Sequence, residues 1–346
     1  HLYMGALVFS AMTATIVIMI YAYLYSKKRR FFKKKKITTQ LNQWISDALV
    51  EGTAIEIKLT PRLAYYFRKE GNRQYITDNL INVKKNFFGA AADNIISLYE
   101  QLGLKEDSVQ KLKSAAWHKK ARGIYELYMM QQRDLLPEIA RHTNNSNELV
   151  RMEAHTAIVG FNGFDGLSFL GTLTYPMNDW HQIKLLEQLH TLDPGNMEGL
   201  PDWLNSRNEY VVLFALKLTD IYQQMHLHDA VVSSLGSKNE KIRYQAIKTL
   251  GRIANETTPA ILMAHYGSEA EANKKNILKQ LAFTATENDL PFLEEQLWEE
   301  SDAIKLEAGR ALVRTSNKGW SILNKASENN DVLQSISKQI KYESAR

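Results

Sequence analysis

The sequence predicts an all-α protein, in which paired helices repeat about every 31 residues as an α-solenoid and one N-terminal helix precedes them. Two observations predict this organisation. The residues from Leu2 to Tyr25 carry no formal charge and are followed at once by a basic run. From Val150 onward, similar helical segments recur at a constant step. An apolar content of 45% is enough for a sizeable buried core.

The N-terminal segment is long enough to cross a bilayer. At about 1.5 Å per residue, a helix from Leu2 to Tyr25 exceeds a hydrocarbon core of roughly 30 Å. A cleaved signal peptide would place positive charge before its apolar stretch, whereas here the charge follows it. Residues 1–25 are therefore predicted to form a transmembrane helix. Ala6, Ser10 and Ala14 recur every four residues along it, which predicts a face for packing against another membrane helix.

A basic collar, residues 26–36, follows this helix and contains no acidic residue. Basic residues beside a span stay on the cytoplasmic side, so we expect an inner (cytoplasmic) membrane protein with its N-terminus outside and a cytoplasmic solenoid. We also expect the collar to contact anionic lipid headgroups. Its eight basic residues are Lys27, Lys28, Arg29, Arg30, Lys33, Lys34, Lys35 and Lys36.

The charge balance reflects this collar. The chain has 43 Lys and Arg against 38 Asp and Glu, a net charge of +5. Because eight of the basic residues lie in the collar, the rest of the chain has slightly more acidic than basic residues. This distribution argues against a nucleic-acid partner for the solenoid.

The repeat consists of a short helix followed by a longer second helix. Segments starting at Val150, Ile242 and Ile304 align without gaps, and weaker copies start at Val211 and Asn273. The last four starts follow a step of 31 residues, and extrapolation backward adds His181. In each copy, positions i, i+4 and i+8 share one helix face that we expect to be buried. A proline opens four of the shorter helices: Pro137, Pro201, Pro259 and Pro291.

These segments resemble HEAT repeats, whose second helix begins with an aliphatic–Arg pair, as Val150-Arg151 and Ile242-Arg243 do here. The resemblance implies a binding scaffold. The family often has Asp in the turn before the second helix, whereas this chain has Asn, Ser or Glu, which leaves polar contacts between repeats open. The predicted domains are a transmembrane helix (1–25), the collar (26–36), a helical cap (37–104), HEAT-like repeats (105–318) and C-terminal capping helices (319–346).

No residue pattern in the sequence predicts catalysis, a cofactor or a metal site. The chain has no cysteine, and its glycine-rich segment 160–166 follows a helix rather than a strand. Three basic residues of the second helices, Arg151, Arg243 and Lys305, are candidates for the solenoid's binding surface. The alternative is that they bond the turns of their own repeats.

The predicted function is a membrane-tethered scaffold that is not an enzyme and binds a partner protein, expected to be an integral membrane protein. Single-span HEAT proteins of this layout resemble accessory proteins that accompany membrane glycosyltransferases in bacterial exopolysaccharide systems. The alternative is nucleic-acid binding, as in some HEAT-like DNA glycosylases. An enzyme of unrecognised type is a third hypothesis.

Overall fold

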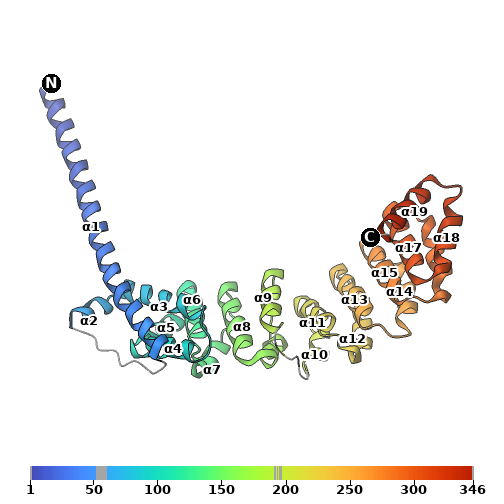
Figure 1. The fold of residues 1–346 in the computed structure, drawn as a ribbon, viewed down its shortest axis with the longest axis horizontal. Coiled ribbons are helices and arrows are strands. Elements are labelled where there is room, and N and C mark those ends of the chain that lie inside the picture. Colours follow the sequence, from blue (N-terminus) through green and yellow to red (C-terminus); the bar gives the residue numbers. More distant parts are fainter. Residues whose placement is uncertain (1, 52–60, 191, 193, 195–196, 345–346) are drawn as a thin grey trace. The chain divides into compact units, whose positions relative to one another are not determined.

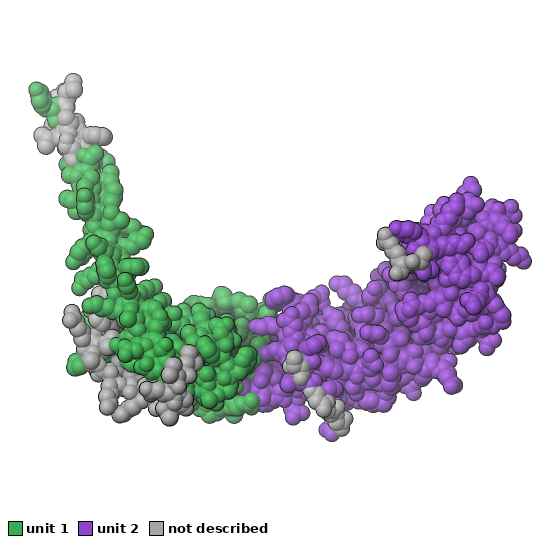
Figure 2. Space-filling model, in the orientation of Figure 1, with its two compact units in different colours: residues 1–157 green, residues 158–346 purple. Residues whose placement is uncertain are grey.

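The computed structural model describes residues 2–51, 61–190, 192, 194 and 197–344, without the side chains of residues 2, 4–10, 30, 33, 48–51, 62, 63 and 66. Every regular element in this part of the chain is a helix, which confirms the all-α class. The chain divides into two compact units, residues 1–157 and 158–346, coloured green and purple in Figure 2. Each unit has its own hydrophobic core.

Unit 1 consists of one long helix and several shorter ones (Figure 1). Ile37, Leu41 and Trp44 of the long helix share a buried cluster with Ile76 and Leu80 of another helix, so the C-terminal third of α1 belongs to the core. The helices are α1 (Leu2–Glu51), α2 (Pro61–Phe67), α3 (Glu70–Lys84), α4 (Ala90–Gln101), α5 (Leu104–Leu112), α6 (Trp117–Met129), α7 (Leu136–Ala140) and the first part of α8 (Glu148–Asn162).

The prediction of a transmembrane helix is wrong. Among the described residues, no helix contains an apolar stretch of the length that a bilayer requires. Apart from Tyr3, the described side chains of α1 begin at Ala11, and Lys27 and Lys28 interrupt the uncharged run well before the roughly 20 residues of a span. The inner-membrane location and the orientation that were inferred from this helix fall with it. Instead, α1 continues as one helix through the basic collar into the core of unit 1.

Unit 2 contains the regular part of the repeat, in which short first helices alternate with longer second helices. The first helices are α10 (Leu200–Leu204), α12 (His228–Ser233), α14 (Thr258–Tyr266), α16 (Leu290–Glu295) and α18 (Asn317–Ser327). The second helices are α9 (Asp179–Leu189), α11 (Glu209–Ile221), α13 (Glu240–Arg252), α15 (Glu271–Thr284), α17 (Asp302–Thr315) and α19 (Asp331–Ser344).

The predicted repeat is confirmed in position as well as in type. The second helices α9, α11, α13, α15 and α17 each begin two residues before the repeat start that the 31-residue step predicts. Three of the four predicted prolines, Pro201, Pro259 and Pro291, occupy the first turns of first helices in unit 2, where their missing N–H leaves no bond unmade. The predicted domain limits within the chain stay predictions.

The second helices pack against one another through a buried stripe. In α13, Ile242 is 3% exposed, and Ala246 and Leu250 are fully buried. Adjacent second helices α11, α13, α15 and α17 contact each other in that order. The small Ala side chain at the centre of the stripe lets neighbouring backbones approach closely, so each repeat buries its apolar face only against the next repeat.

Asparagine fills the turn position where HEAT repeats often have aspartate. The side chains of Asn208 and Asn239 each accept a hydrogen bond from the backbone N–H two residues later and cap their second helices. Each amide also donates a bond that a carboxylate could not. Asn208 donates to the carbonyl oxygen of Leu173 at 2.9 Å, and Asn239 donates to Glu209 at 2.7 Å. These amides therefore cap a helix and join repeats at once.

We expect Ala246→Asp to lower the free energy of unfolding by roughly 3–5 kcal/mol, because it places a carboxylate without a partner at a close helix contact. Urea unfolding followed by far-ultraviolet circular dichroism measures the change. Lys241→Asp, at an exposed position of the same helix, is the control and should be nearly neutral. An unchanged midpoint for Ala246→Asp would contradict the assignment of this helix face.

Candidate functional site

Two of the predicted surface cations close the turns of their own repeats. Arg151 donates from Nη1 to the carbonyl oxygens of Asn145 at 2.6 Å and Ser146 at 2.9 Å. Arg243 donates in the same way to the carbonyl oxygens of residues 237 and 238, at 2.9 and 3.3 Å. The acceptors lie six and five residues before the arginine in both repeats. The aliphatic–Arg pair thus satisfies turn carbonyls that would otherwise lack a donor.

Arg243 also joins its repeat to the next one. Its Nε and Nη2 donate to the two carboxylate oxygens of Glu269, at 2.7 and 3.1 Å, and the Glu269 side chain is only 1% exposed. Burial raises the pKa of Glu269, but hydrogen bonds from Arg243 and Asn273 outweigh that effect and hold the pKa below its ordinary value. Lys305, by contrast, pairs with the exposed Asp302 of its own helix at 2.9 Å.

These contacts predict different costs for two similar substitutions. Arg243→Met should lower the free energy of unfolding by about 3 kcal/mol, because it leaves the buried Glu269 carboxylate without its bidentate partner. Lys305→Met removes only a partly exposed pair within one helix and should cost less than about 0.5 kcal/mol. Chemical denaturation of both variants tests the contrast. Equal stability of the two would contradict the structural role of Arg243.

The predicted residues of α1 do not converge on one site. The side chains of Ala6, Ser10, Arg30 and Lys33 lie outside the described residues, and Ala14 is exposed. The described collar side chains are also exposed: Lys27, Lys28, Arg29, Lys34, Lys35 and Lys36. Lys34 lies over the ring of Tyr75, with its Nζ 5.0 Å from the centroid. Helix packing and lipid binding by these residues stay predictions.

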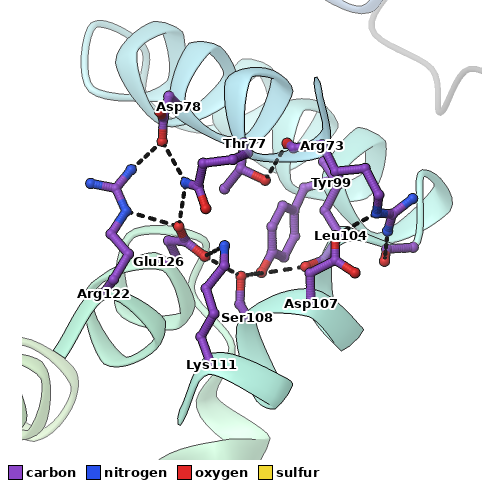
Figure 3. A network of polar contacts seen from close by, with 12 residues as sticks. Arg73, Thr77, Asp78, Tyr99, Leu104, Asp107, Ser108, Lys111, Arg122 and Glu126 are labelled. Atoms are coloured by element: carbon purple, nitrogen blue, oxygen red, sulfur yellow. Dashed lines mark hydrogen bonds and ion pairs between the residues drawn. The ribbon is translucent and has the colours of Figure 1, made fainter. Parts of the chain in front are cut away.

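A buried carboxylate organises the polar centre of unit 1 (Figure 3). Glu126 of α6 is fully buried and accepts hydrogen bonds from four side chains. The donors are Ser108 at 2.6 Å, Lys111 at 2.7 Å, Gln74 at 2.7 Å and Arg122 at 2.8 Å. They come from α3, α5 and α6, so one carboxylate joins three helices.

This network is a structural element rather than a catalytic site. Burial raises the pKa of Glu126, but hydrogen bonds from Lys111, Ser108 and Gln74 reverse the effect and hold the pKa below its ordinary value. A carboxylate that accepts four bonds has no lone pair directed at a substrate. The Tyr99 hydroxyl donates to Ser108 at 2.8 Å, and burial raises its pKa, so it stays protonated.

The depressed pKa of Glu126 makes stability depend on acid. The ionised folded form contributes stability above the ordinary Glu pKa of about 4.3, and this contribution is lost as pH falls through the lower folded pKa. Glu126→Gln should therefore reduce the loss of stability between about pH 5 and pH 3, as measured by urea unfolding at each pH. Glu106→Gln removes an exposed carboxylate of α5 and is the control. Identical slopes for wild type and Glu126→Gln would refute this role.

Unit 2 carries a regular row of cations that the sequence reasoning missed. The row, hereafter the basic row, places one basic residue on each of α11, α13, α15, α17 and α19. The signal was present in the sequence, because every member lies 31 residues after the previous one, six positions past the repeat start. Its members are Lys217, Lys248, Lys279, Arg310 and Lys341.

Most of the basic row contacts acceptors of a neighbouring repeat. Lys217 donates to Gln182 at 2.8 Å, and Lys248 pairs with Asp220 at 3.2 Å. Arg310 donates two bonds to Glu343 of α19, at 3.0 and 2.6 Å. The side chain of Lys248 is nevertheless 52% exposed. The row therefore joins second helices while presenting positive charge on their outward face.

A groove lies at the C-terminal end of this face. It has a volume of about 720 Å³ and is formed by α15, α17, α18 and α19. The guanidinium carbon of Arg314 lies 3.8 Å from the centroid of the Phe283 ring, and Phe283 is 67% exposed. We call this feature the C-terminal groove; residues that define it are Lys279, Phe283, Arg310, Arg314, Trp320 and Glu343.

Comparison with known proteins identifies the repeat. A family model described as HEAT repeats matches residues 228–313, which run from α12 into α17. The chain is therefore a HEAT-repeat protein, as its second-helix pattern predicts. Among curated proteins, no relative is found by sequence.

Three solved structures follow a similar chain path at low identity. An engineered protein is 13% identical with a TM-score of 0.42, over 88% of this chain and 95% of its own. YibA of Escherichia coli is 14% identical with a TM-score of 0.37, over 83% and 99%. Human deoxyhypusine hydroxylase in complex with glycerol is 15% identical with a TM-score of 0.30, over 78% and 96%. Likenesses this remote carry no argument about function.

Proposed function

We propose that this HEAT-repeat protein is a protein-interaction scaffold, and that it binds its partner with the outward face of the second helices of unit 2. The observation that supports this most is the C-terminal groove, a concave site of about 720 Å³ with an exposed aromatic ring and a guanidinium at its edge. Aromatic and Arg side chains are the groups that contribute most to protein–protein binding energy.

Further exposed apolar residues on the same helices extend this surface. Ile221 of α11 is 50% exposed, Tyr244 of α13 is 44% exposed, and Phe283 of α15 is 67% exposed. Ile221 and Phe283 occupy equivalent positions two repeats apart, ten residues past the repeat start. Apolar side chains that recur on the solvent side of a repeat array do not stabilise its core, so a bound partner gives them a role.

The face suits a polypeptide better than a nucleic acid. Asp220, Glu307 and Glu343 lie among the cations of the basic row and pair with them. Carboxylates at this density repel a phosphate backbone, which binds surfaces of one charge sign. The proposal assigns binding and no catalysis, since both acids of the C-terminal groove, Glu307 and Glu343, accept hydrogen bonds from Arg310.

Site-specific photocrosslinking in the native host tests this function. A photoreactive phenylalanine analogue at Phe283 should crosslink to one discrete protein. The same analogue at Trp298, an equally exposed aromatic residue that follows a first helix, should not. Membrane glycosyltransferases of exopolysaccharide systems, which the sequence resemblance suggests, are candidates that mass spectrometry of the product identifies. Equal crosslinking from both positions, or none from Phe283, would rule out this face as the binding surface.

A further inference from the structure

We propose that the C-terminal groove binds an extended acidic segment of the partner protein, with carboxylates at about every third residue. This inference rests on the proposed scaffold function and adds the chemistry of the partner. It follows from three properties of the groove: how its own charges are paired, which apolar groups it exposes, and how its cations are spaced.

Arg310 neutralises the groove's own acids. Its Nε and Nη2 donate to the two oxygens of Glu343 at 3.0 and 2.6 Å, and its Nη1 donates to Glu307 at 2.8 Å. One guanidinium therefore satisfies two carboxylates, which leaves the other cations of the groove less compensated.

The remaining cations are available to a ligand. The nearest acid to Lys279 is Glu307, whose Oε1 is 4.0 Å from the lysine Nζ and already accepts the shorter bond from Arg310. Among the described residues, Arg314 and Lys341 form no ion pair, and both are exposed. The C-terminal groove thus has an excess of positive charge at its rim and is complementary to a segment that carries carboxylates.

The apolar groups of the groove favour a polypeptide over a nucleic acid. Val313, Trp320 and Ile340 line it beside Phe283. Arg314 covers one face of the Phe283 ring, so that face cannot stack on a base. Aliphatic and aromatic side chains of a peptide, in contrast, pack against such a surface without stacking geometry.

The spacing of the cations sets the spacing of the carboxylates. Lys279, Arg310 and Lys341 lie at equivalent positions of consecutive second helices. Packed helices lie about 8–10 Å apart, and an extended chain advances about 3.3 Å per residue. An extended segment that crosses these helices therefore advances about three residues per repeat. A carboxylate at every third position places one acid near each cation.

Fluorescence anisotropy with labelled peptides of about twelve residues tests the inference, using the full chain. The main probe has Glu at every third position with Leu and Ser between, and a second peptide has the same composition with its Glu residues in one block. A third replaces Glu with Lys, and a short DNA duplex is the fourth probe. We expect the spaced acidic peptide to bind about tenfold more tightly than the blocked peptide, a difference of about 1.4 kcal/mol. The Lys peptide and the duplex should bind more weakly still.

A matched pair of variants locates the site. Arg314→Glu should weaken binding of the spaced peptide about tenfold, whereas Lys325→Glu makes the same charge change at an exposed position of α18 outside the groove and should have no effect. Equal melting temperatures show that both variants are folded, and Arg314→Gln replaces Arg314→Glu if the latter is unfolded.

Several results would overturn the proposal: tighter binding of the duplex, equal binding of the Lys peptide, or no effect of Arg314 substitution. The outcome is separate from that of the scaffold function. Crosslinking from Phe283 to a partner without any binding of acidic peptides would keep the function and reject the acidic segment. Peptide binding without crosslinking would keep the groove chemistry and reject the scaffold function.

Discussion

The contact between successive second helices is the interaction on which unit 2 depends. No repeat can bury its apolar face alone, so the stripe that includes Ile242, Ala246 and Leu250 is solvent-free only because the neighbouring helix covers it. This requirement fixes the length of the repeat, since one added residue would rotate the following face by about 100°. Every outward position inherits the same step. The basic row is regular because the core beneath it is regular.

Charge pairs add a second layer of contacts between repeats. Arg243 binds Glu269 beneath the surface, while Lys248 and Arg310 bind acids of neighbouring repeats at the surface. Exposed pairs contribute little energy each, whereas the pair at Glu269 is costly to break because its carboxylate is buried. The buried pair therefore contributes to stability, and the exposed pairs mainly set the electrostatic character of the face.

The sequence predicted the repeats well, because burial, proline at helix starts and the 31-residue step are local properties that one chain displays. It missed the Glu126 network, whose donors Gln74, Ser108 and Lys111 lie on separate helices and follow no period. It missed the basic row because the step was applied only to apolar positions. The membrane helix was predicted from an absence of charge between Leu2 and Tyr25, whereas the structure shows α1 as one helix that extends from this stretch into a folded core.

The C-terminal groove exists only in molecules whose α19 is docked, because Ile340 and Glu343 of that helix form part of its wall. In the described chain α19 packs mainly on α17 and α18, and helices at the edge of a repeat array open at lower free energy than those in its middle. A ligand that binds only the docked form shifts this local equilibrium by mass action. Recognition at the groove and the folding of the terminal repeat are therefore thermodynamically linked, and amide hydrogen exchange in α19 reports the occupancy of the site.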